Sequence, residues 1–435
     1  MIELTILGVV FTVLLFFGVP VSFCIGIATL LALFNVTPDI PTAFVISAQR
    51  MTSSLDSFTL VAIPLFILAG SMMNTGGIAL RLIDFAKVIV GWLPGSLAHI
   101  SCVANALFGA ISGSAVASAA AVGSTLSPLQ RKEGYDMPFC AAVNVASSPC
   151  GLLIPPSGAL IVYSLISGGT PVDVLFVAGY VPGLMMAIAV MLWVAWKARG
   201  GFLPTTVHRY TVGESLRITL RAIPALLLVL IIMGGIVAGV FTATEAAGVA
   251  ALYTFILGKF LYKSLSWKGL VKATLDASVG TAVVMLMVGV SMTMSWLLAS
   301  TGSAKMLADA IIAFSDNPYM LMLLFNVLLL VLGTFLDITP GLLIFTPIFL
   351  PVAMKLGISP VHFGIIITFN LCIGIATPPV GSTLFVSARV AKVSLSQLTK
   401  PLLPMFALEI LALFLVTYFP ALSLWLPEMV LGKVS

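Results

Sequence analysis

Apolar segments long enough to cross a bilayer follow one another along almost the whole of this 435-residue chain. Hydrophobic residues make up 60% of it, charged residues only 8%, and the mean hydropathy is +1.19. Soluble domains carry about 25% charged residues, and no single core could hide this much apolar surface. Lipid must therefore be the solvent of this chain, and apolar helices satisfy their own backbone groups there. We therefore predict an all-α, polytopic membrane protein.

Hydropathy predicts ten spans, of which the fourth and the ninth are broken. They are residues 4–19, 20–36, 58–75, 135–168, 172–196, 222–241, 243–258, 275–300, 361–392 and 403–426. Two further stretches, 95–128 and 318–356, are too long for one span and are interrupted midway by small or helix-breaking residues. We predict that each forms a re-entrant hairpin, since irregular backbone at that depth persists only beside protein or a watery cavity.

The breaks in the fourth and ninth spans are Pro-Pro pairs, at 155–156 and 378–379. Proline removes a backbone donor and clashes with the preceding turn, so each pair is expected to divide its span into two half-helices. The alternative is a packed helix with a simple kink. Two breaks at corresponding places favour half-helices whose ends face the interior.

Four motifs recur at a nearly constant spacing. Gly18 pairs with Gly239, Asn74 with Ser300, Gly109 with Gly333 and Pro155 with Pro378, at offsets of 221, 226, 224 and 223. The chain is thus predicted to contain two repeats, residues 1–196 and 222–435, joined by a polar linker at 197–221. Five spans per repeat is an odd number, so the second repeat is inverted, a transporter design.

The basic residues predict the orientation. One orientation places 16 of the 20 Lys and Arg residues in cytoplasmic loops and leaves Arg50, Lys305, Lys355 and Lys433 outside. Both termini then face the periplasm or exterior. Segments 78–93 and 303–314 carry charges on one face and are predicted to be interfacial helices, or alternatively plain connectors.

The first hairpin tip, Ser112-Gly113-Ser114, offers hydroxyl and carbonyl oxygens that suit a hard cation such as Na⁺, with Asn144 in the broken span as a further ligand. Small residues also simply pack helices, which is the alternative.

In the second hairpin, Asp337 is a carboxylate within an apolar stretch. Such a group is a functional candidate by default. The residues expected to join it in a site are Thr334, Thr339, Asn370 and Thr377. Alternatively, Asp337 caps the N-terminus of the second hairpin helix.

An organic anion could bind where the half-helix after Pro155-Pro156 begins, at Ser157 and Gly158, because helix N-termini attract negative charge. Arg389 could pair with that anion or serve as a positive-inside anchor. We expect the substrate near Ser114, Ser157, Gly158, Asp337 and Arg389.

The remaining candidates indicate no catalysis. The five cysteines and three histidines show no metal spacing, and no phosphate-binding GxxxxGK[ST] loop exists in the sequence. Glu245 is expected at a helix start, and Glu409 is an unexplained acid inside the last span. We predict no enzyme activity and no nucleic-acid partner.

Five motifs, in order, resemble those of the large membrane subunit of tripartite ATP-independent periplasmic (TRAP) transporters. They are ISGSAVASAAAVGS, LLIPPSG, FTATEAAGVAALY, LGTFLDITPGLLIFTPIFLPV and TPPVGSTLF. The resemblance extends over residues 4–426. It implies a bacterial cytoplasmic-membrane importer that uses Na⁺ as coupling ion and carries an organic acid such as a C4-dicarboxylate, sialic acid, or a keto or sugar acid. It also implies two partners, a small four-helix membrane subunit and a periplasmic substrate-binding protein, and an elevator motion.

Carried over residue by residue, the family's Na⁺ sites correspond to Ser112, Gly113, Ser114 and Asn144, and to Gly333, Asp337 and Thr377. The rival interpretations are a self-sufficient Na⁺/carboxylate symporter without a binding protein, a membrane enzyme and a passive channel.

Overall fold

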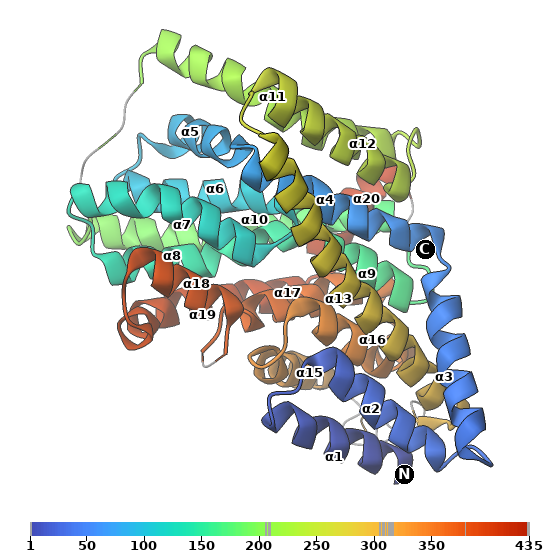
Figure 1. Cartoon of the computed structure of the whole chain (residues 1–435). Helices are drawn as coiled ribbons and strands as arrows, with labels where there is room; N and C mark the ends of the chain where they lie inside the picture. The colour runs from blue at the N-terminus through green and yellow to red at the C-terminus, as the bar shows by residue number, and fades with distance from the viewer. Residues whose placement is uncertain are drawn as a thin grey trace.

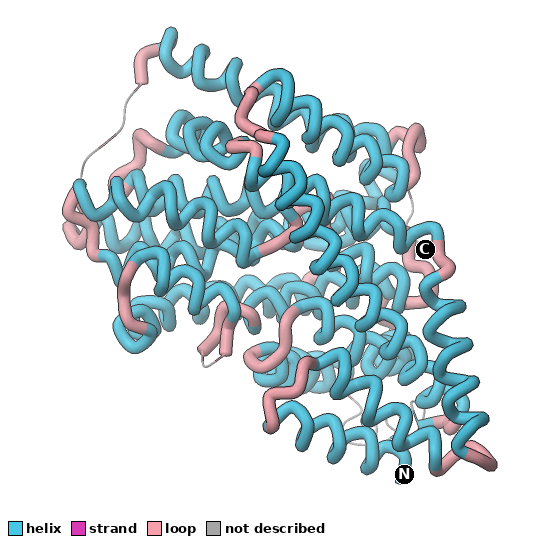
Figure 2. Tube along the Cα trace, in the orientation of Figure 1, coloured by secondary structure: helices cyan, strands magenta, loops and turns pink. Residues whose placement is uncertain are grey.

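The computed structural model describes residues 2–204, 207, 210–303, 306, 309, 311, 317–378 and 380–432. Within these residues every regular element is a helix, and the helices pack in layers that run across the molecule (Figures 1 and 2). Seven described helices are long and apolar enough to cross a membrane. The prediction of an all-α, polytopic membrane protein is confirmed.

The first half of the chain contains ten α-helices and two short 3₁₀ segments. They are α1 (Ile2–Phe16), α2 (Val21–Phe34), α3 (Ile40–Leu55), η1 (Phe58–Val61), α4 (Ala62–Thr75), α5 (Ile78–Val90), α6 (Ser96–Ser112), α7 (Ala115–Lys132), α8 (Met137–Ser147), η2 (Ser148–Leu152), α9 (Gly158–Ile166) and α10 (Val172–Arg199).

The described helices of the second half follow a similar order. They are α11 (Val212–Val237), α12 (Ala243–Ile256), the π-turn η3 (Leu257–Leu261), α13 (Trp267–Ser300), α15 (Pro318–Gly333), α16 (Ile338–Lys355), α17 (Pro360–Gly374), α18 (Ser382–Ala391), α19 (Leu395–Tyr418) and α20 (Ala421–Leu431). Most of the predicted interfacial segment 303–314, and Pro379 of the second Pro-Pro pair, lie outside the described residues.

Several boundaries differ from the hydropathy prediction. Both ends of the predicted linker 197–221 are helical, because α10 continues to Arg199 and a Thr211/Glu214 capping box starts α11 at Val212. α13 also starts earlier than predicted, at Trp267. Helix α3 was not predicted, and the predicted span 403–426 merges α19 with the start of α20. α3 is polar along much of its length, yet Asp39 caps it by accepting from Thr42 N at 2.7 Å. Capping and polar helical turns carry no hydropathy signal.

The two halves repeat one close crossing of backbones. α6 passes η2 at Gly109 and Gly151, and a Cβ added to Gly151 would collide with the Gly109 backbone. α15 passes α17 in the same way at Gly333 and Gly374. Only glycine permits such an approach, so the predicted pairing of Gly109 with Gly333 reflects a shared packing requirement.

Buried asparagine pairs join the same elements in each half. Asn105 Nδ2 of α6 donates to Asn144 Oδ1 of α8 at 3.0 Å. Asn370 Nδ2 of α17 donates to Asn326 Oδ1 of α15 at 2.8 Å. Both pairs link the first hairpin helix to the first part of the broken helix, so each hairpin and its broken helix form one polar-bonded unit.

The helices form two groups. The first group, called here the frame, is α1–α4 with α11–α13, in which α13 packs against α2, α3 and α4. In Figure 1, α13 crosses the front of the molecule diagonally, between α11–α12 above and α2–α3 below. The second group, called here the body, contains both hairpins, both broken helices, α10, α19 and α20. α5 lies against α6 of the body and α11 of the frame.

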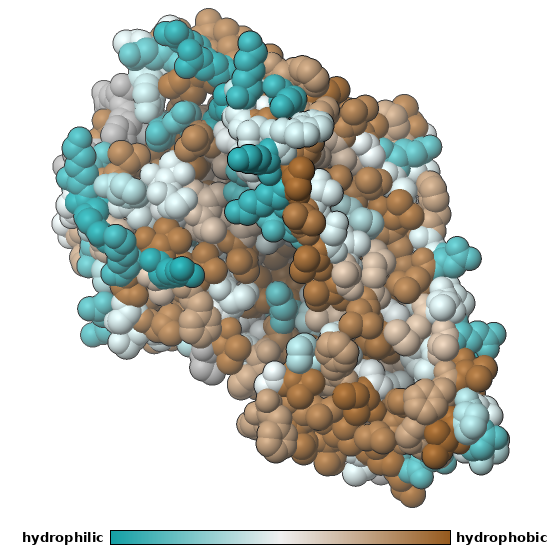
Figure 3. Space-filling model, in the orientation of Figure 1, coloured by the Kyte–Doolittle hydropathy of each residue, from teal (hydrophilic) through white to brown (hydrophobic). Residues whose placement is uncertain are grey.

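Hydrophobic side chains cover much of the visible surface, while hydrophilic ones gather mainly at one side (Figure 3). Large apolar residues are exposed along α1–α3, α11–α13 and α15, among them Phe16, Leu230 and Val279. Exposed apolar surface on this scale is expected of a protein whose solvent is lipid.

Candidate functional site

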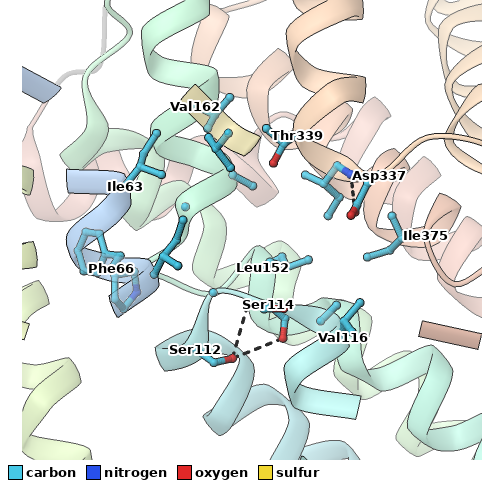
Figure 4. A pocket seen from close by; sticks show the side chains of 18 of the residues that line it. Ile63, Phe66, Ser112, Ser114, Val116, Leu152, Val162, Asp337, Thr339 and Ile375 are labelled. Carbon is cyan, nitrogen blue, oxygen red and sulfur yellow. Dashed lines mark hydrogen bonds between the residues drawn. The ribbon is translucent and has the colours of Figure 1, made fainter. Parts of the chain in front are cut away.

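A cavity of about 210 Å³ lies where the first hairpin tip, the start of α9 and the start of α16 meet (Figure 4). Polar groups from Ser112, Ser114, Asp337 and Thr339 face it. At about 30 Å³ for each water molecule, the cavity has room for about seven waters or a small organic molecule of similar size.

Three helix N-termini converge on this cavity. α7 begins after Ser114, whose side chain accepts from Ala117 N. α9 begins at Gly158, after Ser157, and α16 begins after Asp337. Each helix N-terminus carries roughly half a positive charge and unpaired N–H groups, so together they favour an anion.

The local sequence explains why the hairpin turns at this depth. Gly113 ends α6 in the left-handed region, at φ +62°, and Ser114 immediately caps α7. Ser112 Oγ accepts from Ser114 N at 3.4 Å across the turn. A glycine that can adopt positive φ, followed by a capping serine, reverses the chain within two residues.

Asp337 has a double role in the structure. Its Oδ1 accepts from Ile338 N at 2.8 Å as the N-cap of α16. The residue is nevertheless exposed and lines the central cavity. Both alternatives raised from the sequence, a cap and a cavity carboxylate, therefore hold together.

A second cavity, of about 180 Å³, adjoins the second hairpin tip and shares Asp337 and Ile375 with the first. Gly333, Thr334 and Ser382 also line it. The Ser382 Oγ has no hydrogen-bond partner among the described residues although it is buried. A carboxylate beside an unpaired hydroxyl is a donor set that suits a hard cation such as Na⁺.

The structure brings together six of the ten residues predicted as site candidates. Ser112, Gly113, Ser114, Gly158 and Asp337 line the central cavity. Gly333 lines the second cavity beside Asp337. Of their predicted companions, Thr339 lines the central cavity and Thr334 lines the second one.

The other four predicted site residues lie outside both cavities. Ser157 is fully buried, and its Oγ bonds the Leu152 carbonyl and the Leu160 N–H. Thr377 Oγ1 donates to Ile373 O at 2.7 Å. Asn144 Nδ2 donates to Ala119 O at 2.8 Å and to Ser387 Oγ at 3.0 Å. Arg389 lines a separate basic recess near the end of α7.

The sequence did not predict which residues of the frame line the cavity. Ile63 and Phe66 of α4 and Val284 of α13 line it opposite the polar groups. No sequence signal separates these residues from other apolar residues of the spans. The unpaired Ser382 follows the second Pro-Pro pair closely, as Ser157 follows the first.

Among the described residues, no group of three or more His, Cys, Asp and Glu side chains is arranged to hold a metal ion. The five cysteines are buried free thiols. His362 bonds Ser423 Oγ through Nδ1 at 2.6 Å, which ties α17 to α20.

Comparison with known proteins agrees with the family resemblance and with the helical fold. A Salmonella typhimurium protein named YgiK, described as uncharacterized, is 50% identical over 96% of both chains. The Vibrio cholerae sialic acid TRAP transporter large permease protein SiaM is 40% identical, over 96% of this chain and 97% of that one. Among solved structures, the Alcanivorax borkumensis YdaH transporter aligns with a TM-score of 0.60 at 16% identity, over 88% of this chain and 89% of that one.

Residues 8–422 match the family described as the DctM component of tripartite ATP-independent periplasmic transporters. This match extends over nearly the whole chain and agrees with the family resemblance of the five motifs. The chain belongs to the DctM family of TRAP transporter large permeases.

Proposed function

We propose that this permease is the large membrane subunit of a Na⁺-coupled secondary importer that takes up an organic acid. In this proposal a periplasmic binding protein delivers the acid, and a small four-helix subunit completes the membrane complex. The observation that carries the proposal is the central cavity, where three helix N-termini face a carboxylate, Asp337.

The electrostatics of the cavity favour an anion and a cation together. The helix N-termini attract a carboxylate. Asp337 would repel that carboxylate unless a cation lies between them, since like charges disfavour each other at short range. A Na⁺ ion held by Asp337 and Ser382, in the second cavity, would relieve this repulsion. Binding of the acid and binding of Na⁺ would then depend on each other.

The organic-acid class is supported by the Vibrio cholerae relative, whose name specifies sialic acid, a carboxylated sugar. It is also supported by the cavity itself, which combines N-termini for a carboxylate with serine and threonine hydroxyls from Ser112, Ser114 and Thr339. Membership of the family supports the bacterial cytoplasmic membrane, and the positive-inside pattern supports both termini in the periplasm.

An elevator motion is part of the proposal. The cavity lies between the polar tips of the body and an apolar wall of the frame, formed by α4 and α13. The frame residues that line the cavity are bulky and apolar. Nearby, but not in the cavity lining, Gly70 of α4 packs closely against the Ser112 backbone. Such a wall makes few directional bonds with the body, so it suits a surface along which the body slides.

The test is uptake in proteoliposomes that contain this chain and its small subunit, with the binding protein outside. Labelled sialic acid and succinate serve as probes under an inward Na⁺ gradient, and an equal K⁺ gradient is the control. Uptake of an acid only with Na⁺ is expected. Equal uptake in both gradients would contradict Na⁺ coupling. Uptake by the chain alone, without either partner, would instead support a self-sufficient symporter.

A further inference from the structure

A basic recess of about 600 Å³ lies between the C-terminal parts of α7 and α18, away from both cavities of the proposed transport site. Ser124, Ser127, Pro128, Arg131, Arg389, Val390 and Lys392 line it. α7 leads from one site to the other. Ser124 lies ten residues beyond Ser114, which is about 15 Å along a helix. Hydrophilic side chains gather over this end of the molecule, at the left in Figure 3.

The recess is built from both halves of the chain. α7 and α18 pack side by side. Arg131 Nη2 at the end of α7 donates to the Ala391 carbonyl at the end of α18, at 2.8 Å. This bond joins the two walls and fixes the position of one guanidinium before any ligand arrives.

Lys392 reaches the recess from an unusual backbone conformation. It caps α18 in the left-handed region, at φ 55°, which side-chain-bearing residues adopt at an energetic cost. Only one other described non-glycine residue, Lys263, has a positive φ, at 51°. Strain of this kind persists where the surrounding structure requires it, and it often marks functional sites.

The basic side chains in the recess carry more positive charge than the negative ends of the two helices offset. Arg131, Arg389 and Lys392 contribute three positive charges, and none of the residues that line the recess within the described chain is acidic. The two helix C-termini contribute about half a negative charge each and so offset about one of the three. A net charge of about two remains, beside two serine hydroxyls.

We propose that this recess binds a phosphate group, either as the free dianion or as part of a phosphorylated small molecule or lipid headgroup. Arginine guanidinium groups and hydroxyls are the donors that tetrahedral oxyanions prefer, and a dianion matches the residual charge. The site does not depend on the proposed transport function, since it shares no residue with either cavity.

The test uses the full chain purified in detergent and exchanged into phosphate-free chloride buffer. Inorganic phosphate is titrated while thermal unfolding and the binding isotherm are followed. Phosphate should raise the unfolding midpoint of the wild type. Arg389→Gln and Lys392→Gln should each weaken phosphate binding about tenfold, as expected for the loss of one charged donor.

Lys263→Gln is the matched control, because it also replaces a lysine at positive φ, outside the recess. It should bind phosphate like the wild type. Native mass spectrometry adds a second measurement. A phospholipid retained by the wild type and lost from Arg389→Gln would identify a lipid headgroup as the source of the phosphate and support the site.

Two results would overturn the proposal. The first is a wild type that shows neither a phosphate effect nor a retained phospholipid. The second is a phosphate effect that persists unchanged in the Arg389→Gln, Lys392→Gln double variant.

Discussion

At the scale of single residues, the glycines at the helix crossings are positions where the fold tolerates little change. Replacing Gly151 with Ala would place a methyl group inside the Gly109 backbone. We expect a loss of about 1–3 kcal/mol of stability, as for other overpacked cores. Gly374→Ala should have a similar effect at the corresponding crossing of α15 and α17.

The measurement for these glycines is the midpoint of thermal unfolding in detergent. Gly234→Ala is the control, since a Cβ there meets nothing within 4 Å. Equal midpoints for Gly151→Ala and Gly234→Ala would show that the crossing is looser than the structure indicates.

Asn144 distinguishes a structural role from an ion-binding role. The sequence predicts it as a Na⁺ ligand, whereas the structure shows its amide bonded to Asn105, Ala119 and Ser387. Asn144→Ala would leave several buried groups unpaired, each at about 1–3 kcal/mol. We expect a clearly lower unfolding midpoint in Na⁺-free buffer, with the exposed Asn35→Ala as control. A normal midpoint without Na⁺, combined with lost stabilisation by Na⁺, would restore Asn144 as a ligand.

At the scale of helices, the proposed elevator motion predicts that contacts between frame and body change during transport. Phe66 of α4 and Ser114 of the first hairpin tip line the same cavity. Ile111 of the same hairpin also lines this cavity and offers no proposed ligand atom. With the native cysteines replaced, a Phe66→Cys, Ile111→Cys pair should crosslink through a short bis-maleimide to an extent that Na⁺ and substrate alter.

A pair inside the body provides the control for crosslinking. Ser124 of α7 and Val390 of α18 line one recess on two packed helices. A Ser124→Cys, Val390→Cys pair should crosslink equally under all conditions. If the Phe66–Ile111 pair is just as insensitive, the body does not move against α4.

The same helices show what sequence could and could not predict. The Pro-Pro pair at 155–156 lies in the gap between η2 and α9, where the sequence predicts the break, because proline acts through local backbone chemistry. The boundaries of α3 and α11 were missed, since polar or capped turns carry no hydropathy signal. α20 is itself apolar, and hydropathy did not separate it from α19, which ends only two residues before it. Asp337 was identifiable because a carboxylate in an apolar stretch is unusual.

At the scale of the whole molecule, the surroundings of Asn144 and Arg389 could not be predicted. Their roles depend on partners from distant segments, such as the bond from Asn144 to Ser387 of the other half. Spacing along the chain places such residues on the correct helix but does not show which side chain they face. For the same reason, the sequence did not show that Ile63, Phe66 and Val284 line the cavity on the side of the frame.

The account as a whole depends on the carboxylate that the two cavities share. Asp337→Asn retains an oxygen that can cap α16 but removes the charge, so the fold should persist while Na⁺ binding is lost. Contacts to a charged group contribute about 1.5–3 kcal/mol, which corresponds to about a 10- to 100-fold loss of Na⁺-driven uptake. The exposed, cavity-remote Asp56→Asn is the control.

The most direct measurement is therefore the Na⁺ dependence of labelled organic-acid uptake by Asp337→Asn in proteoliposomes, beside wild type and Asp56→Asn. The proposed mechanism predicts a correctly inserted Asp337→Asn protein with little or no Na⁺-driven uptake, and wild-type uptake by Asp56→Asn. Wild-type uptake with wild-type Na⁺ dependence in Asp337→Asn would contradict the central claim that this cavity is the transport site.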